Sequence, residues 1–229
     1  MKLGLTFLTA VAISVVAAPA QAAVLNANKP CYREGDAKDP VVFGGGPFTP
    51  GGNVNVTRDG LPIGTLETDA AGNISGVLTR PPIIDPANER SFTLMATDQV
   101  NPGLTGTLTR LVSQLDVNVR PTGGKPAVKR RISARGFTGG GSLYAHVVRR
   151  GKTRNVRIGA LTGPCGTLST KKRVFSKKAK NGTYRVQFDA SPSYSTATYP
   201  SLTFRVRIFT VFRRRASSAG GGESWVRVD

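Results

Sequence analysis

Apolar and polar residues alternate along most of the chain in short stretches, and no stretch of useful length has the spacing of an amphipathic helix. In GTYRVQFD, for example, Tyr184, Val186 and Phe188 alternate with Arg185 and Gln187. A period of two places neighbouring side chains on opposite faces of a strand, so the first three are predicted to face a core and the other two to face solvent. Together with frequent Gly and Pro turns, this pattern predicts an all-β protein.

The same pattern occurs twice. FTPGG, which begins at Phe48, recurs as FTGGG from Phe137, and IGTL, which begins at Ile63, recurs as IGAL from Ile158. A repeat of about ninety residues with seven short strands in each copy indicates two tandem units. The predicted organisation is a leader (residues 1–22), a first domain (23–114), a second domain (115–215) and a flexible C-terminal tail (216–229). In the second domain, strands are expected near residues 115–120, 128–135, 143–148, 153–161, 167–175, 183–189 and 201–212.

These motifs resemble tandem bacterial immunoglobulin-like (Ig-like) domains of exported proteins. The resemblance rests on FTPGGNVNV, DGLPIGTLETDAAGNISG and SFTLMATD in the first copy and on RISARGFTGGG and NGTYRVQF in the second. It implies two β-sandwiches of immunoglobulin type, with Tyr184 in the place of a tyrosine corner. Such domains serve as spacers, adhesins, and carbohydrate-binding or enzyme-associated modules, so the resemblance selects no single function.

The N-terminus predicts export. A positive Lys2 precedes an apolar run from Leu3 to Ala18, and the small-residue pattern Ala20-Gln21-Ala22 follows. This is typical of a secretory signal peptide that is cleaved after Ala22, whereas a membrane anchor would need about 20 uninterrupted apolar residues and this run breaks at Pro19. We therefore expect a mature chain without a transmembrane segment, secreted or located in the cell envelope, where disulfides persist.

Cys31 and Cys165 are the two cysteines of the chain. The Ig resemblance implies strands that alternate up and down, with the link between the domains near Ser113 and Gln114. Both cysteines then lie in turns at the junction, and we predict a disulfide between them. Two free thiols or a bond between separate molecules remain as alternatives. A metal site is not expected, because two thiols without neighbouring histidines do not complete a four-ligand set.

Charge divides the chain unevenly. Residues 24–114 carry seven Lys/Arg against nine Asp/Glu, whereas residues 115–229 carry 24 Lys/Arg against four Asp/Glu. If the strands run alternately up and down, many Lys and Arg residues of the loops lie at the end of the second domain that is far from the junction. We call this predicted set the basic pole: Lys125, Arg149, Arg150, Lys152, Lys177, Lys178, Lys180, Arg213, Arg214 and Arg215. Outward strand positions extend the positive field along both faces: Lys129, Arg131, Arg135, Arg185, Arg205 and Arg207.

The basic pole has two interpretations. Charged loops can serve solubility alone, or they can dock on a polyanion such as a wall polymer, an acidic polysaccharide, anionic lipid headgroups or nucleic acid. The chain contains no motif for reading bases, so sequence-specific nucleic-acid binding is not expected. Tyr194 and Tyr199 are expected in a loop at the opposite end, where they cover the sandwich or form a stacking surface for carbohydrate.

Catalytic chemistry is not expected. His146 is the one histidine, and no acid shares its strand, so we expect a surface or packing residue rather than a general base. Asp189 is the one acid inside the strands of the second domain, which leaves no carboxylate pair. Glu34, Asp36 and Asp39 form an acidic cluster that can be interpreted as a weak Ca²⁺ site or as a hydrated turn, and the spacing favours the turn. No cofactor or metal is predicted.

The sequence thus predicts a monomeric, non-enzymatic structural or adhesive module at the cell envelope or outside the cell, with an anionic wall polymer or acidic polysaccharide as partner of the basic pole. A dedicated polyanion- or carbohydrate-binding protein, in which the first domain is only a spacer, is the alternative. An accessory module of a hydrolase is a third interpretation.

Overall fold

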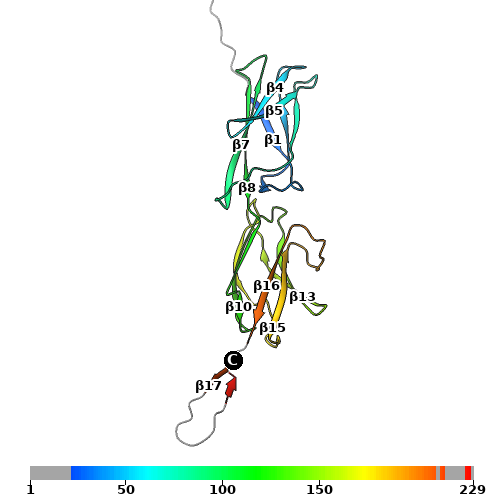
Figure 1. The fold of residues 1–229 in the computed structure, drawn as a ribbon. Coiled ribbons are helices and arrows are strands. Elements are labelled where there is room, and N and C mark those ends of the chain that lie inside the picture. Colours follow the sequence, from blue (N-terminus) through cyan, green and yellow to red (C-terminus); the bar gives the residue numbers. More distant parts are fainter. Residues whose placement is uncertain (1–21, 210–211, 215–224, 228–229) are drawn as a thin grey trace, which may run out of the picture.

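The computed structural model describes residues 22–209 in full and the backbone of residues 212–214 and 225–227. The described chain consists of strands and connecting loops, which form an upper lobe (residues 22–113) and a lower lobe (residues 116–208) joined end to end (Figure 1). No described helix is long and apolar enough to cross a membrane. The predicted signal peptide lies outside the described residues apart from Ala22, and so does the predicted tail apart from the backbone of β18 (Trp225–Arg227).

The upper lobe, called the N-terminal lobe below, has eight described strands: β1 (Ala23–Ala27), β2 (Cys31–Arg33), β3 (Val41–Gly46), β4 (Asn53–Arg58), β5 (Leu61–Glu67), β6 (Ile74–Leu78), β7 (Glu89–Asp98) and β8 (Thr105–Ser113). They follow the order β5-β4-β7-β8-β1-β3-β6, and β2 pairs with β8. Strand β1 pairs with β3 on one side and with β8 on the other, so it connects the two layers.

The lower or C-terminal lobe contains β9 (Asp116–Arg120), β10 (Gly123–Gly124), β11 (Arg130–Arg135), β12 (Ser142–Arg149), β13 (Lys152–Ala160), β14 (Leu168–Lys172), β15 (Gly182–Asp189) and β16 (Ser201–Ile208). They form a five-stranded sheet, β10-β16-β15-β12-β13, and a three-stranded sheet, β14-β11-β9. A separate strand pair, β17 (Phe212–Arg214) with β18, lies below this lobe (Figure 1).

The two lobes share one strand arrangement. In each lobe a short early strand, β2 or β10, runs parallel to the last strand, β8 or β16. In the N-terminal lobe β1 also runs parallel to β8, and the remaining strand pairs of both lobes are antiparallel. A parallel first-to-last pair within an antiparallel two-layer sandwich is the immunoglobulin-like arrangement. The predicted all-β, Ig-like fold class is confirmed. The number of independently folding domains, with the boundaries given above, stays a prediction.

Each lobe encloses its own hydrophobic cluster. Buried apolar residues of the N-terminal lobe run from Ala23 to Val112, and those of the C-terminal lobe run from Val117 to Ile208. The repeated phenylalanines Phe48 and Phe137 are buried in the respective clusters. Alternation along each strand supplies these side chains, because every second residue faces the opposite sheet.

Tyr184 is the tyrosine corner that the resemblance implied. Its hydroxyl donates a hydrogen bond to the carbonyl oxygen of Lys180, four residues earlier, at 2.8 Å. In β15, Tyr184, Val186 and Phe188 are buried and Arg185 is exposed, as alternation predicts.

Gln187 corrects the alternation argument. It was predicted to face solvent, but it is buried on the outer face of the five-stranded sheet. Its amide donates to Asp189 Oδ2 at 2.8 Å and to the carbonyl oxygen of Ser195 at 2.7 Å. The loop after β15 therefore folds back over this face, and local periodicity carries no information about such a cover.

A second correction concerns the first cysteine. Cys31 was placed in a turn, but it begins the short strand β2, whose residues pair in parallel with the end of β8. Three residues are too few to produce a recognisable alternating pattern, so sequence periodicity gives no signal for this strand.

Candidate functional site

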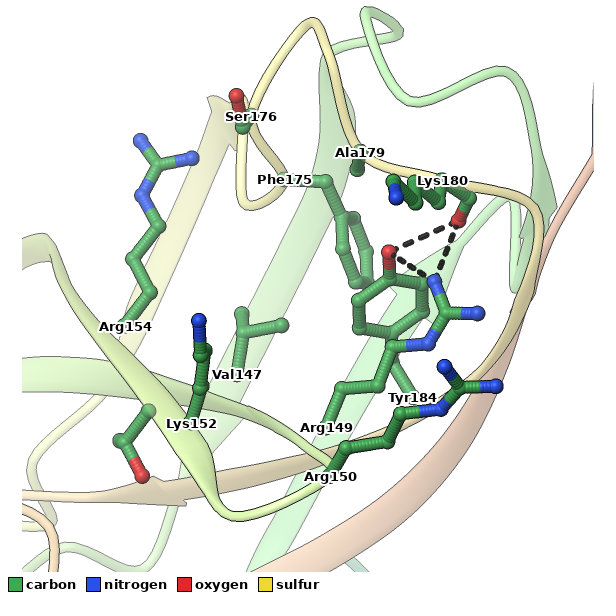
Figure 2. Close-up of a pocket in the computed structure, with 11 residues that line it drawn as sticks. Val147, Arg149, Arg150, Lys152, Arg154, Phe175, Ser176, Ala179, Lys180 and Tyr184 are labelled. Carbon is green, nitrogen blue, oxygen red and sulfur yellow. Dashed lines mark hydrogen bonds between the residues drawn. The ribbon is translucent and has the colours of Figure 1, made fainter.

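The candidate site is the end of the C-terminal lobe that points away from the N-terminal lobe. At this end, the turn between β12 and β13 lies beside the loop between β14 and β15, which carries Lys177, Lys178 and Lys180. Arg149 joins the two, because its Nη1 donates to the carbonyl oxygen of Lys180 at 2.9 Å (Figure 2). Its Nη2 donates to the carbonyl oxygen of Asn181 at 2.7 Å. The lysine loop is thus bonded to the end of a sheet strand.

Two aromatic rings lie between two guanidinium groups beneath this loop. Arg149 lies over the ring of Tyr184 with its Cζ 4.7 Å from the centroid, and Tyr184 meets Phe175 edge to face at 5.3 Å. Arg130 lies over the other ring, with its Cζ 4.8 Å from the centroid of Phe175. This ladder of arginine, two rings and arginine fixes the loop from below, because cation–π and edge-to-face contacts both restrict the ring planes.

Arg130 was missed as a candidate residue. It is fully buried, and its Nη atoms donate to the carbonyl oxygens of Val128 (3.2 Å) and Gly123 (3.4 Å), while its Nε has no hydrogen-bond partner. Desolvation lowers the pKa of this guanidinium. The sequence does contain a signal, since Arg130 is in phase with the buried Ile132 and Ala134 of the same strand.

A cavity of about 420 Å³ opens beside the ladder (Figure 2). Val147, Phe175 and Tyr184 line its floor, and the cations stand at its rim: Arg149, Arg150, Lys152, Arg154 and Lys180. Arg150 occupies the left-handed region with φ of 47°, at the tight turn before Gly151, and its side chain is exposed.

Carboxylates are scarce in this lobe. Among its described residues the acids are Asp116 and Asp189, and both lie near the junction. Asp116 pairs with Arg135 at 3.7 Å, and Asp189 lies 3.1 Å from His146. No described carboxylate therefore neutralises the cations at the far end, and the positive potential there remains available to an external anion.

The structure brings part of the predicted basic pole together. Arg149, Arg150, Lys152 and Lys180 surround one cavity, and Lys177 and Lys178 are exposed on the loop beside it. Lys125 directly follows β10, whose glycines pair with β16. The side chains of Arg213 and Arg214, and the whole of Arg215, lie outside the described residues. Anion binding by these residues remains a prediction.

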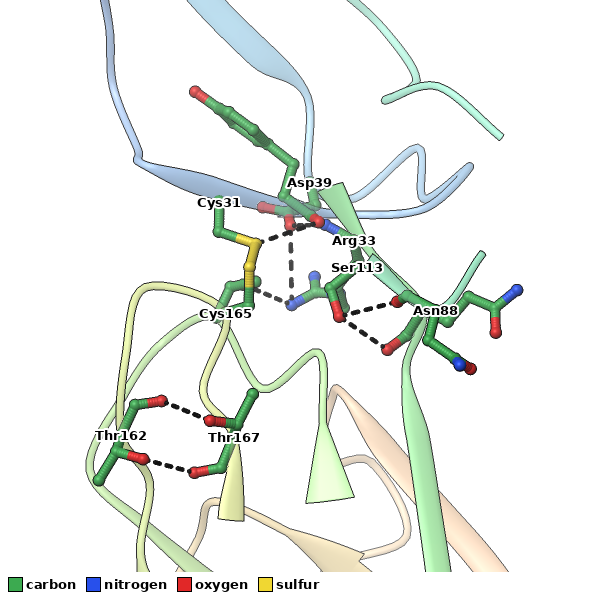
Figure 3. Close-up of a disulfide and its surroundings, with 11 residues drawn as sticks. Cys31, Arg33, Asp39, Asn88, Ser113, Thr162, Cys165 and Thr167 are labelled. Carbon is green, nitrogen blue, oxygen red and sulfur yellow. Dashed lines mark hydrogen bonds and ion pairs between the residues drawn. A yellow bond between two sulfur atoms is a disulfide. The ribbon is translucent and has the colours of Figure 1, made fainter. Parts of the chain in front are cut away.

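The junction between the lobes contains the predicted disulfide. Cys31 and Cys165, 134 residues apart, are bonded, with their Cα atoms 5.3 Å from each other (Figure 3). Gly166 follows with φ of 60°, and a Cβ there would lie 2.0 Å from the carbonyl oxygen of Phe137. A glycine is required at this position, because any side chain would collide with the backbone of Phe137, which packs against the turn that holds Cys165.

Tyr199 adds a second, non-covalent connection between the lobes. Its hydroxyl donates to Asp36 Oδ2, and two cations contact its ring, with Arg33 Cζ 5.0 Å and Lys38 Nζ 4.6 Å from the centroid. Burial raises the pKa of Asp36, but the hydroxyl of Tyr199 and the guanidinium of Arg33 outweigh this effect and hold that pKa below its usual range. Arg33 also donates to Thr138 Oγ1 at 3.4 Å. The predicted placement of Tyr199 at the junction is thus correct.

His146 is buried in a polar network and is not a surface residue. Its Nε2 lies 3.1 Å from Asp189 Oδ1 and its Nδ1 lies 2.9 Å from Asn155 Oδ1. No acid shares the strand of His146, as expected, but Asp189 at the end of the neighbouring strand β15 lies beside its ring. The ring is fully buried with both nitrogens directed at side-chain oxygens, so His146 is a packing residue that holds Asp189 in place. Asp189 in turn accepts from the backbone N–H of Ser191, in the loop after β15. Tyr194 of that loop lies over this network, with its ring centroid 5.9 Å from that of His146.

The acidic cluster of the N-terminal lobe is used internally. Glu34 Oε1 accepts from the backbone N–H of Ile84, and Asp39 Oδ1 accepts from Lys29 Nζ at 2.5 Å. Asp36 is taken by Arg33 and Tyr199 as described above. The cluster lies in a turn, as expected, and ion pairs and backbone donors hold its carboxylates. Among the residues placed by the structure, no group of three or more His, Cys, Asp and Glu is arranged to hold a metal ion.

No protein-family model matches the chain, and no curated protein is similar to it in sequence. Solved structures with related strand arrangements include a tetra-tandem repeat from the extending region of a large adhesion protein (15% identity, TM-score 0.30, 83% of this chain and 50% of that chain). A second is the human OSCAR ligand-binding domain (15% identity, TM-score 0.32, 82% of this chain and 96% of that chain). A third is a 1.5-MDa bacterial ice-binding adhesin (16% identity, TM-score 0.34, 82% of this chain and 62% of that chain). The chain spans half the length of the tetra-tandem repeat. Likeness at these TM-scores carries no functional argument.

Proposed function

We propose that the protein is an exported, non-enzymatic adhesive module of the tandem bacterial Ig-like kind, and that its basic pole docks on an anionic wall polymer or acidic polysaccharide. The N-terminal lobe then acts as a rigid extension that holds the docking lobe away from whatever lies beyond it.

One observation carries this proposal: cations from two separate loops surround a single cavity, and no described carboxylate of the lobe lies near them. A solvated surface that serves solubility alone gains most from charges of both signs, spread evenly. The segregation of one sign at one end instead favours contact with a partner of opposite charge, through counterion release and Coulomb attraction.

The internal bonds of the pole support the same proposal. Arg149 is committed to the carbonyl oxygens of Lys180 and Asn181, so in this account it positions the lysine loop and does not bind the polymer directly. Holding the loop in advance lowers the conformational entropy that its lysines would lose on binding. The contacting residues are then Arg150, Lys152, Lys177, Lys178 and Lys180.

The test is binding of the full chain to an immobilised sulfated polysaccharide over a range of salt concentrations. Replacing Lys177, Lys178 and Lys180 by Gln should weaken binding about tenfold or more and flatten the salt dependence. A charge-matched control replaces Arg58, Arg80 and Arg90 of the N-terminal lobe by Gln and should change affinity less than about threefold. Equal losses in both variants, or none in either, would contradict docking through the pole.

A further inference from the structure

A second cationic feature lies on the side of the C-terminal lobe and not at its end. On the outer face of the three-stranded sheet, Arg131 of β11 is directly opposite Arg120 of β9 on one side and Lys171 of β14 on the other. We call these three residues the cationic row. All three are exposed, and neighbouring strands are about 4.8 Å apart, so three like charges cross the sheet in register.

This arrangement opposes folding. Like charges directly opposite each other on neighbouring strands destabilise a sheet, and the central Arg131 has two such neighbours. The one carboxylate within these three strands, Asp116, lies at the junction end and pairs with Arg135 at 3.7 Å. Repulsion within the cationic row is therefore not relieved by any acid of its own sheet.

The N-terminal lobe shows that the fold does not require this row. Val42 of β3 stands at the same place as Arg131, six residues before the buried phenylalanine of the repeat, and it pairs with Val77 of β6. Both valines are exposed, by 39% and 58%. The same face of the same sandwich thus remains compatible with folding when it is uncharged, so the charges of the cationic row call for another explanation.

Polar groups adjoin the row. The next register row toward the junction consists of Asn118, Ser133 and Ser169. Asn118, Ser133, Arg120 and Arg131 line a shallow hollow of about 210 Å³, and Arg120 Nε donates to Asn118 Oδ1 at 3.2 Å, which orients the guanidinium. Two guanidinium groups with a hydroxyl and an amide beside them are the donor set that tetrahedral oxyanions accept.

We propose that the cationic row is a second binding surface, which takes sulfate or phosphate groups of a linear acidic polysaccharide laid across β9, β11 and β14. The hollow between Arg120 and Arg131 holds one oxyanion of the polysaccharide, and Lys171 contacts the next anionic group of the same polysaccharide. This inference extends the proposed function to another face, yet it rests on different residues from the basic pole, so either surface can fail without the other.

The test compares two triple variants of the full chain with equal loss of charge. The row variant carries Arg120→Gln, Arg131→Gln and Lys171→Gln, and the control carries Arg157→Gln, Arg205→Gln and Arg207→Gln on the five-stranded sheet. Affinities are measured for a sulfated oligosaccharide, a phosphate-bearing oligosaccharide and a carboxylated oligosaccharide of equal charge, with single-stranded DNA as a further probe. The affinity of the row variant for the sulfated or the phosphate-bearing probe should be lower by about tenfold or more than that of the native protein. Comparison of these two probes shows which group is bound.

The outcomes separate the surfaces. Equal losses in row and control variants would overturn the inference while leaving the basic pole untouched, and a row-dependent loss only for the carboxylated probe or only for DNA would overturn the stated ligand class. Thermal unfolding adds a readout without any ligand: Arg131→Gln should raise Tm by about 1–3 °C at low salt, because it removes both repulsions. An unchanged or lower Tm would contradict the repulsion on which the inference rests.

Discussion

The two lobes place different residues at one corresponding pair of strand positions. Val41 and Val42 open β3 in the N-terminal lobe, and Arg130 and Arg131 open β11 in the C-terminal lobe, each pair standing at the same spacing before a buried phenylalanine. In both lobes the first residue of the pair is fully buried and the second is exposed. One sandwich therefore accepts valines and arginines at the same sites, on the inside as well as on the outside.

The difference between these residue pairs shows that the fold does not require arginine at either position. Burial of Arg130 is tolerated because its guanidinium contacts the ring of Phe175 and donates to two carbonyl oxygens. Phe175 belongs to the loop between β14 and β15, which carries Lys177, Lys178 and Lys180 of the basic pole. Exposure of Arg131 requires no such partner. The C-terminal lobe thus has one arginine inside the sandwich and one on its outer face at these two positions. The N-terminal lobe has valines at both.

The largest effect is expected where the two lobes are joined. Replacing Cys31 and Cys165 by Ser should lower the free energy of unfolding by about 4–5 kcal/mol in the chain-entropy model, because the bond closes a loop of more than a hundred residues. Denaturant unfolding should then resolve separate transitions for the two lobes, and small-angle scattering should show a broader range of interlobe angles. Cooperative unfolding of the Ser variant with the midpoint of the native protein would contradict a clamping role.

The buried position of the pair gives the second prediction. Val41→Arg should destabilise the N-terminal lobe by about 3–5 kcal/mol, since it buries a charge where no partner has been provided. The matched change Arg130→Met should alter stability by less than about 2 kcal/mol, because loss of the charge also removes its desolvation penalty. Chemical denaturation followed by far-UV circular dichroism measures both. Tolerance of Val41→Arg would show that the ladder around Arg130 is not needed.

A smaller effect distinguishes the buried aspartates at the ends of β7 and β15. Asp98 accepts from the backbone N–H groups of Thr49, Val100 and Asn101, whereas Asp189 faces His146 and Gln187. Burial raises the pKa of Asp98, but the backbone donors outweigh it and lower that pKa to about 2.

Because the folded pKa of Asp98 lies below the unfolded one, its contribution to stability is complete above about pH 4 and disappears as the pH falls toward 2. Asp98→Asn should cost about 2 kcal/mol at pH 7 and flatten the acid limb of the stability curve. The measurement is urea unfolding at a series of pH values, with Glu67→Gln as an exposed control. If the Asp98→Asn variant loses stability at low pH as steeply as the native protein, Asp98 is not the cause of that loss.

Sequence reasoning reached the parts of this structure that depend on local periodicity and chain topology. Alternation identified the strands and the inward Tyr184, Val186 and Phe188, and the alternating strand directions brought Cys31 to Cys165. It could not find Gln187 and His146 in a buried network, because a loop from beyond β15 covers them. Nor could it recognise the cationic row, since cross-strand register depends on how far each strand slides along its neighbour.

The central claim is that external anions bind the C-terminal lobe and not the N-terminal lobe, and lysine footprinting tests it within one molecule. Acetylation rates are measured by peptide mass spectrometry with and without a sulfated polysaccharide. The account predicts protection of Lys152, Lys171, Lys177, Lys178 and Lys180, with unchanged rates at Lys29 and Lys38. Equal protection in both lobes, or none in the C-terminal lobe at a polymer concentration that saturates binding, would contradict it.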